Sequence, residues 1–296
     1  MISSYIQLLR PHQWLKNTFV FLPLFFGQQL LNTTNWLPIF CAFFAFCFAS
    51  SGVYCLNDIC DVEADKKHLH KRERPIASGK ISKICGYVIM SICWGVAFAF
   101  ILLGCGIETK VSAYCIGLLS LYVIINIAYS FRLKYVSIVD VFIIALGFVF
   151  RVVLGGIIIG IALSNWIVLM TFLLCLFIAL AKRRDDVIIY EQTGEKLRSN
   201  INQYNSAFIN MAICIVASIT MVCYILYTVS IEVVERIGSQ HVYMTSIFVL
   251  AGILRFIQIA VVDKNSGSPT KIILTDRFII GCIVSWLSFF TFLLYF

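Results

Sequence analysis

Residues 56–80, LNDICDVEADKKHLHKRERPIASGK, form the longest strongly polar run in a chain that is otherwise mostly apolar. The run opens with an amide and three carboxylates, at Asn57, Asp58, Asp61 and Asp65, and turns basic from Lys66. This spacing predicts that the first four side chains crowd one face of a helix. Because carboxylates then face a cluster of cations, the stretch predicts a site for a divalent metal and a phosphorylated ligand.

The composition of the whole chain predicts an all-α polytopic membrane protein. Of its 296 residues, 60% are hydrophobic and only 13% are charged, and the mean hydropathy is +0.92, which excludes an ordinary soluble globule. Hydropathy predicts about nine spans, the first interrupted by Pro23 and Gly27. The expected spans are residues 18–32, 37–56, 84–105, 112–130, 138–161, 165–181, 207–229, 243–262 and 278–296. We therefore expect one integral membrane domain over residues 1–296, with cytoplasmic loops at 57–83 and 182–206.

The basic residues predict the orientation of these spans. With a cytoplasmic N-terminus, the outer loops keep only Lys110 and Arg236, and the other loop cations face the cytoplasm. The positive-inside rule predicts this asymmetry for a multi-pass protein of the plasma membrane. The net charge of +8 is attributed to this topology and to an anionic substrate, so no nucleic-acid partner is expected.

The polar run carries ligands of the kind that magnesium prefers. Hard oxygen ligands without a nearby cysteine pattern favour Mg²⁺ over Zn²⁺. The expected metal ligands are Asn57, Asp58, Asp61 and Asp65. His68 and His70 lack the HxxxH or HExxH spacing of a helical metal pair. An ordinary solvated loop is the alternative, although it does not explain acidic residues at helical spacing where a span ends.

Further candidates lie at the ends of neighbouring spans. Lys16 and Asn17 begin the first span and are expected to reach the site, although Trp14 and Lys16 also suit anchors at the membrane interface. Lys134 follows the fourth span and is expected to bind phosphate, the alternative being a charge that only ends the span.

A second pair of charges belongs to the fifth span. Asp140 and Arg151 are separated by about three helical turns and so share a face, about 16 Å apart. An arginine near mid-membrane costs at least about 2.5 kcal/mol. We therefore expect Arg151 to face the interior and meet an anion, with a structural pairing to a buried carbonyl or carboxylate as the alternative.

A second polar cluster follows the sixth span, on the same side as the first. Lys182, Arg183 and Arg184 precede Asp185 and Asp186. These cations are able to anchor a span, but next to two carboxylates they repeat the chemistry of residues 56–80. The loop continues to Tyr204 through a segment rich in hydrogen-bonding side chains.

The pattern NDxxDxxxD after the second span, with a second polar loop after the sixth, resembles the UbiA superfamily of intramembrane prenyltransferases. Four stretches resemble one branch of it, the decaprenyl-phosphate phosphoribosyltransferases. They are LRPHQWLKN at 9–17, NDICDVEADKKHLHKRERPIASGK at 57–80, YSFRLKYVSIVDVFIIALGFVFR at 129–151 and LAKRRDD at 180–186. The resemblance implies a UbiA-like bundle around a central cavity open to the cytoplasm.

The same resemblance implies an activity. Enzymes of this branch transfer 5-phosphoribosyl from phosphoribosyl diphosphate to a polyprenyl phosphate, with Mg²⁺, for cell-envelope polysaccharide synthesis. Asp58, Asp61 and Asp65 would then be catalytic. The residues expected to bind substrate are Lys16, Asn17, Asn57, Lys66, Arg72, Arg74, Tyr129, Lys134, Asp140, Arg151, Lys182, Arg183, Arg184 and Tyr204. The expected partners are the two substrates and membrane lipid, and a homo-oligomer is left open.

The second polar loop differs from that of the superfamily, and the difference concerns the donor substrate. Its second loop usually carries another DxxxD motif, whereas Asp185 and Asp186 are adjacent and point about 100° apart on a helix. The cations at 182–184 instead suit a donor with an additional 5-phosphate. A prenyltransferase acting on an aromatic acceptor is the nearer alternative. A transporter of a polyprenyl-linked sugar is the farther one, and the scarcity of charge in the outer loops disfavours it.

Overall fold

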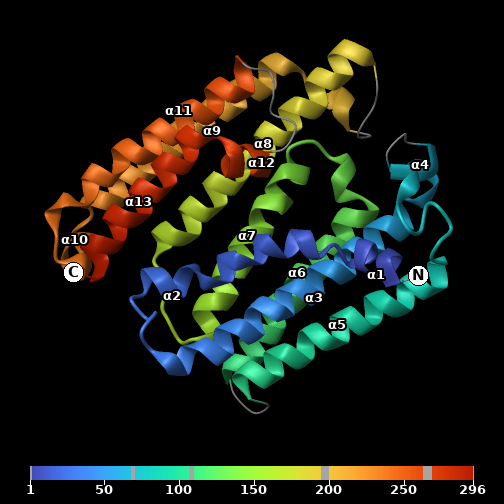
Figure 1. Ribbon diagram of the computed structural model, residues 1–296, viewed down its shortest axis with the longest axis horizontal. Helices are drawn as coiled ribbons and strands as arrows, with labels where there is room; N and C mark the ends of the chain where they lie inside the picture. Colours follow the sequence, from blue (N-terminus) through green and yellow to red (C-terminus); the bar gives the residue numbers. More distant parts are fainter. Residues whose placement is uncertain (1, 68–70, 107–109, 195–199, 263–268, 296) are drawn as a thin grey trace. The chain divides into compact units, whose positions relative to one another are not determined.

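The structure is a computed structural model of the chain that describes residues 2–67, 71–106, 110–194, 200–262 and 269–295. These residues form helices joined by short connections (Figure 1). Eight of the helical segments described are long and apolar enough to cross a membrane. The predicted all-α polytopic class is therefore confirmed. The chain divides into two compact units, residues 1–163 and 164–296, so a single domain over residues 1–296 stays a prediction.

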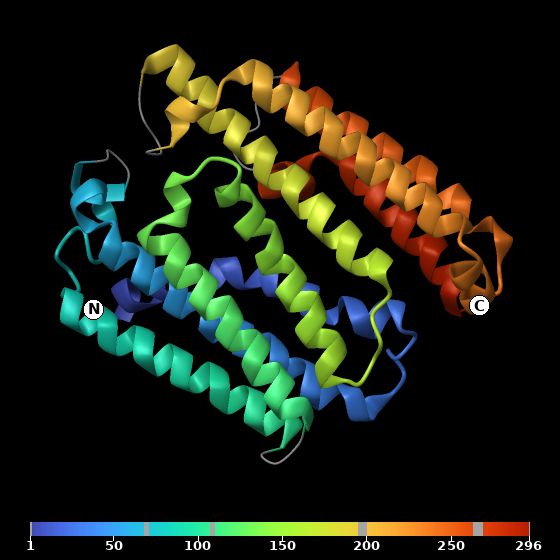
Figure 2. The ribbon, with the colours of Figure 1, turned by 180° about the vertical axis from the view of Figure 1, so that it is seen from behind.

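Unit 1 is built around α3, which is the most enclosed of the candidate spans. Helix α5 runs alongside α3 (Figures 1 and 2), and η1, α6, α7 and α1 also pack against it. The helices of unit 1 are α1 (Ile2–Leu9), η1 (Pro11–Phe21), α2 (Leu22–Phe26), η2 (Thr33–Asn35), α3 (Trp36–Cys60), α4 (Val62–Lys67), η3 (Lys71–Glu73), α5 (Lys83–Cys105), α6 (Lys110–Phe131), η4 (Leu133–Tyr135) and α7 (Val139–Ile158).

Small residues let the helices of unit 1 pack closely, as is common in membranes. A Cβ added at Gly155 of α7 would lie 2.1 Å from the carbonyl oxygen of Val20 in η1, and one at Gly52 of α3 would lie 2.4 Å from the indole nitrogen of Trp94. The apolar core of the unit gathers around these contacts, with Ala45 and Phe46 of α3 fully buried.

The first predicted span, residues 18–32, has a different construction from the others. It is divided between the 3₁₀ helix η1 and the short helix α2, and the chain turns at Gln28, whose φ is +56°. Pro23 has no amide hydrogen and so cannot continue an α-helical hydrogen-bond ladder. The other eight predicted spans correspond to the eight long helical segments.

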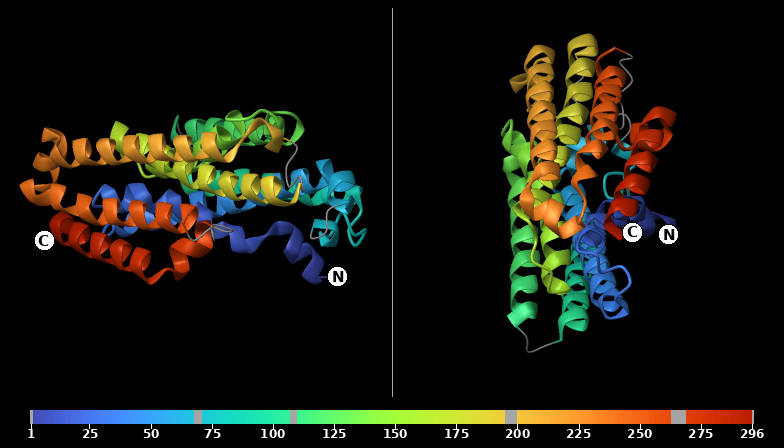
Figure 3. Two further views of the ribbon diagram at one scale, coloured as in Figure 1. Left: turned by 90° about the horizontal axis from the view of Figure 1, so that it is seen from above. Right: turned by 90° about the vertical axis from the view of Figure 1, so that its left-hand side faces the viewer.

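Unit 2 is a helical bundle in which α9 packs against α8 and α11, and α11 packs against α13 (Figure 3). Polar contacts join its helices inside the apolar surroundings. The Tyr224 hydroxyl lies 2.6 Å from the Thr245 hydroxyl and accepts a hydrogen bond of 2.6 Å from Trp286. The helices of unit 2 are α8 (Asn165–Thr193), η5 (Ile201–Gln203), α9 (Ser206–Val229), α10 (Ile231–Ile237), η6 (Gln240–Thr245), α11 (Ser246–Val261), α12 (Pro269–Thr275) and α13 (Arg277–Tyr295).

Candidate functional site

The polar end of α3 lies among side chains from five other segments of unit 1. Asp58 is on the last turn of α3, and its side chain is only 2% exposed. One of its oxygens, Oδ1, accepts a hydrogen bond of 2.6 Å from Arg10 and another of 3.1 Å from Arg74. The other oxygen, Oδ2, is buried and has no hydrogen-bond partner. A buried carboxylate oxygen left in this state is costly and needs an explanation.

Arg74 connects two of the predicted carboxylates. Its Nη1 lies 3.1 Å from Asp58 Oδ1 and 2.7 Å from Asp65 Oδ2, so a single cationic nitrogen is held between two acidic side chains. The loop that carries Arg74 is anchored by Ile76 and Ile81, which are buried in a small apolar cluster with Ile59. This packing fixes where the arginine is presented.

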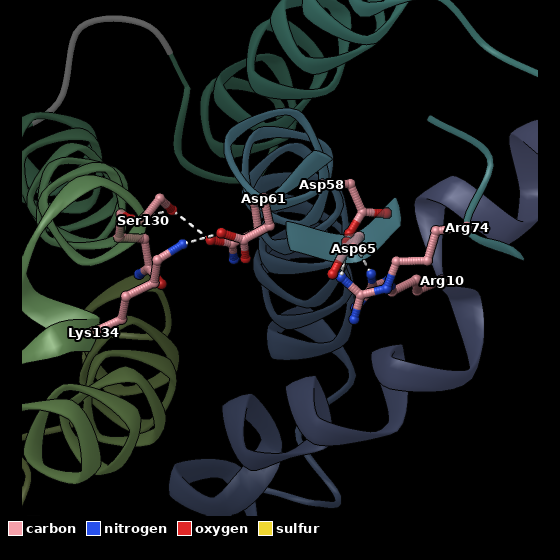
Figure 4. Close-up of polar contacts among 9 residues, drawn as sticks. Arg10, Asp58, Asp61, Asp65, Arg74, Ser130 and Lys134 are labelled. Atoms are coloured by element: carbon pink, nitrogen blue, oxygen red, sulfur yellow. Dashed lines mark hydrogen bonds and ion pairs between the residues drawn. The ribbon is translucent and has the colours of Figure 1, made fainter. Parts of the chain in front are cut away.

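Asp61 faces the other way, toward α6 and η4 (Figure 4). It lies between α3 and α4 with φ −92° and ψ 4°, and hydrogen bonds from the Asp61 amide to the Asn57 carbonyl and from the Asp65 amide to the Asp61 carbonyl continue the helical pattern through it. Lys134 of η4 forms an ion pair with Asp61 Oδ1. Next to it, Ser130 donates a hydrogen bond of 2.7 Å to Asn57 Oδ1.

The four expected metal ligands are therefore divided into two groups in this arrangement. Among the described residues, no three His, Cys, Asp or Glu side chains lie close enough to hold one metal ion. Asp58 and Asp65 nevertheless converge on one positive charge and offer a buried oxygen without a partner. Hard carboxylate oxygens suit Mg²⁺, so this pair fits such an ion, and the roles of Asn57 and Asp61 as ligands stay predictions.

Arg10 was not among the residues that the sequence predicted for the site. It precedes η1 and reaches Asp58 across 48 positions of sequence, and its guanidinium carbon lies 5.0 Å from the centre of the Tyr54 ring. The sequence offered one signal, because Arg10 lies within the stretch LRPHQWLKN that resembles the phosphoribosyltransferase branch.

Asn17 and Arg151 meet deep inside unit 1. The Asn17 side chain donates to Cys47 Sγ at 3.2 Å and accepts from Arg151 Nε at 2.7 Å. Arg151, which is 6% exposed, also donates to the Gly147 carbonyl and lies over the rings of Phe46, Tyr122 and Phe148. These neighbours are all neutral. They agree with the structural alternative, in which Arg151 pairs with a buried carbonyl.

The other candidates of unit 1 are less closely associated with the carboxylates. Asp140 is fully buried and accepts a hydrogen bond of 2.9 Å from the Val141 amide. Lys66 pairs with Glu63 at the surface. Arg72 is exposed, and Lys16 and Tyr129 are half-buried. Their substrate-binding roles stay predictions. His68 and His70 lie outside the described residues.

Arg183 and Arg184, two of the predicted cations of unit 2, have partners within that unit. Arg183, 2% exposed, pairs with Asp186 at 3.1 Å. Arg184 donates to Asn210 at 2.7 Å and to the carbonyl of Ala260. Lys182 is exposed, and Tyr204 is buried beside Phe208. Their expected contacts with substrate remain predictions.

These observations define a multi-pass α-helical membrane protein with ion-paired carboxylates at the end of an enclosed helix. Residues 20–280 match the model of the UbiA prenyltransferase family. The chain belongs to that family, as its resemblance predicted.

Two relatives match nearly the whole chain. The decaprenyl-phosphate phosphoribosyltransferase of Corynebacterium glutamicum is 29% identical over 293 residues, which cover 97% of this chain and 85% of the relative. The enzyme of the same name from Mycolicibacterium smegmatis is 28% identical, with 97% and 91% covered.

Solved structures share the fold. A UbiA homolog from Archaeoglobus fulgidus bound to GPP and Mg²⁺ has a TM-score of 0.70 at 19% identity, covering 96% of this chain and 98% of that one. At this level of identity the likeness concerns the fold alone, and it supports the predicted UbiA-like class.

Proposed function

We propose that the protein transfers the 5-phosphoribosyl group of phosphoribosyl diphosphate to a polyprenyl phosphate and releases diphosphate. The observation that carries this proposal is that relatives named decaprenyl-phosphate phosphoribosyltransferase match 97% of the chain. The site in unit 1 supports it, because its cations and carboxylates suit a donor that brings both phosphate and metal.

In the proposed reaction, a phosphate oxygen of the lipid attacks C1 of the ribose as the bond from C1 to diphosphate breaks. The lipid phosphate is already ionised at neutral pH, so the protein needs no strong general base. Asp58 and Asp65 would hold Mg²⁺, with Asp61 and Asn57 as further expected ligands. When bound, the ion supplies stabilisation of the negative charge that develops on the leaving diphosphate.

The cations of the chain would bind the phosphates. Arginine suits forked contacts with phosphate oxygens better than lysine does, so Arg74 is assigned to the diphosphate. Lys134 and Lys16 are assigned to the same group as point charges. Arg151 is the candidate for the acceptor headgroup, and Lys182, Arg183, Arg184 and Tyr204 are the candidates for the 5-phosphate.

The reaction would take place at the cytoplasmic face of the plasma membrane. The concentration of loop cations on one side of the predicted spans supports this orientation, and the family and the helices support a multi-pass membrane protein. The product, a polyprenyl phosphoribose phosphate, would serve as a precursor of cell-envelope polysaccharide.

A transfer assay tests the proposal. The purified protein is incubated with phosphoribosyl diphosphate labelled in the ribose, a polyprenyl phosphate and Mg²⁺, and the label extracted with the lipid is counted. We expect lipid-linked label from the parent chain and from Arg132→Gln, which removes an exposed charge, and none from Asp58→Asn.

A parallel reaction distinguishes the family's other chemistry. The same preparation receives labelled prenyl diphosphate and an aromatic acceptor. Label on the aromatic product, with none transferred from phosphoribosyl diphosphate, would overturn the proposal and favour a prenyltransferase.

A further inference from the structure

The residues next to Arg10 hold it firmly against α3. The carbonyl oxygen of Leu9, directly before it, accepts a hydrogen bond of 2.7 Å from Ser51. The Trp14 indole, shortly after it, donates one of 3.0 Å to the same Ser51 hydroxyl. Ser51 lies about two helical turns before Asp58 and on the same face of α3. One fully buried serine thus binds the chain on both sides of Arg10.

Arg10 also has an unusual backbone conformation. Its φ of 52° and ψ of 58° lie in the left-handed region, which residues other than glycine rarely adopt. Such strain persists only where the surroundings enforce it, and it concentrates at functional sites. Here the enforced conformation directs the guanidinium of Arg10 to a carboxylate that is 2% exposed.

The charges around Asp58 are balanced without any added ion. Arg10 and Arg74 supply two positive charges, and Asp58 and Asp65 supply two negative ones. A divalent cation placed between the carboxylates would lie beside two guanidinium groups and be repelled by them. An anionic ligand arriving with the cation removes this conflict, because the arginines then gain phosphate oxygens as partners.

We propose that Arg10 is a donor-binding residue that makes metal binding depend on the donor. In the unliganded protein it neutralises Asp58 and competes with a metal ion for Oδ1. When metal and phosphoribosyl diphosphate arrive together, its guanidinium passes from the carboxylate to a phosphate oxygen. This inference rests on the proposed function, since it takes the donor to be an anionic diphosphate.

The alternative is a purely structural ion pair between the start of the chain and α3. The two possibilities differ in what happens when the charge is removed. If Arg10 competes with the metal ion, removal of its charge lets the metal alone bind more tightly and weakens binding of the donor. Loss of a structural pair weakens both interactions or changes neither.

Two binding measurements on purified Arg10→Gln test the proposal. The Kd of Mn²⁺ alone, as a spectroscopic stand-in for Mg²⁺, is measured by electron paramagnetic resonance. The Kd of labelled phosphoribosyl diphosphate at saturating Mn²⁺ is measured by equilibrium dialysis. Coupling between sites typically amounts to about 5–150-fold, so we expect Mn²⁺ alone to bind about tenfold tighter and the donor to bind about tenfold weaker.

Three further variants support the interpretation of those changes. Arg10→Lys keeps the charge and should restore most of the parental values. Ser51→Ala keeps Arg10 but removes the two hydrogen bonds that position it, so it should shift both constants partway in the same directions. Arg132→Gln, which removes an exposed arginine of the same unit, should leave both constants unchanged.

Opposite shifts of the two constants in Arg10→Gln would support the proposal, and shifts of the same sign, or none, would overturn it. Arg74 also pairs with Asp58 in the parent chain, so we expect the buried carboxylate to keep a partner in this variant. If Arg10→Gln fails to fold, Ser51→Ala decides by the same criterion. A parent chain that binds Mn²⁺ and donor but transfers no ribose phosphate would contradict the proposed function alone.

Discussion

Lys134 and Asp61 form an ion pair across 73 positions of sequence. The pair joins η4, just after α6, to the junction of α3 and α4, and Asp61 is directed away from Asp58 and Asp65 (Figure 4). Asp61 therefore pairs with Lys134. The cations beside Asp58 and Asp65 are instead Arg10 and Arg74.

Replacement of Lys134 should reduce transfer strongly. If Lys134 binds donor phosphate, Lys134→Met should lower kcat/KM about 10²–10³-fold, the range that removal of a transition-state charge donor typically gives. Steady-state assays with varied phosphoribosyl diphosphate measure this change. Arg132→Gln is the matched control, and an unchanged kcat/KM in Lys134→Met would exclude Lys134 from donor binding.

The sequence predicted the carboxylate half of the site because that signal is local. Asp58, Asp61 and Asp65 stand at helical spacing where an apolar stretch ends, which an uninterrupted helix would place on one face. The pairing of Asp61 with Lys134 was not predicted, because the two residues lie 73 positions apart in the sequence. The helical class and the eight long spans were predictable for the same reason as the carboxylates, since hydropathy is local too.

Arg10 shows what could not be predicted. Its proposed role depends on a left-handed backbone, on Ser51 and on Asp58, and these come together only in the folded unit. Likewise, nothing local reveals that the neutral partners of Arg151 include Asn17, which lies 134 positions earlier.

Gly155→Ala should destabilise unit 1. The added methyl group would lie 2.1 Å from the carbonyl oxygen of Val20, far inside van der Waals contact. Because this contact is with backbone, η1 has to shift, and overpacking of this kind typically costs about 1–3 kcal/mol. Thermal unfolding in detergent measures the loss. Gly117→Ala, where an added Cβ meets nothing within 4 Å, should leave the melting temperature near the parental value or raise it.

Asn17→Ala should also destabilise the protein. The change removes the acceptor of the 2.7 Å hydrogen bond from Arg151 Nε, and leaves a buried charged donor without its partner. Loss of one partner of a buried hydrogen bond costs about 1–3 kcal/mol. Asn17→Gln retains an amide and tests geometry, since its longer side chain should restore little. Thermal unfolding equal to the parent in Asn17→Ala would contradict this account of Arg151.

The ion pair between Arg255 and Asp276 predicts a pH dependence of stability in unit 2. Arg255 Nη2 lies 2.9 Å from Asp276 Oδ2, and the Ile279 amide donates to Oδ1 at 3.0 Å at the start of α13. Hydrogen bonds from Arg255 first, and from the backbone of Ile279 next, lower the pKa of Asp276 below its usual value. The folded state therefore favours the ionised carboxylate.

The sign of the effect follows from linkage. Because the folded pKa of Asp276 lies below the unfolded value of about 4, its contribution is complete above that pH and is lost as pH falls through the folded pKa. Arg255→Gln should lower the melting temperature at pH 7, and the difference from the parent should shrink as the pH falls below about 4.

Asp276→Asn provides the control for this prediction. Asparagine still accepts the amide hydrogen bond at the start of a helix, so the variant removes the charge and retains the cap. Its melting temperature should differ from the parental one at pH 7 and converge with it in acid, because the parental carboxylate is then neutral as well. A difference from the parent that is constant across the acid range would show that the Asp276 charge does not contribute to the stability of unit 2.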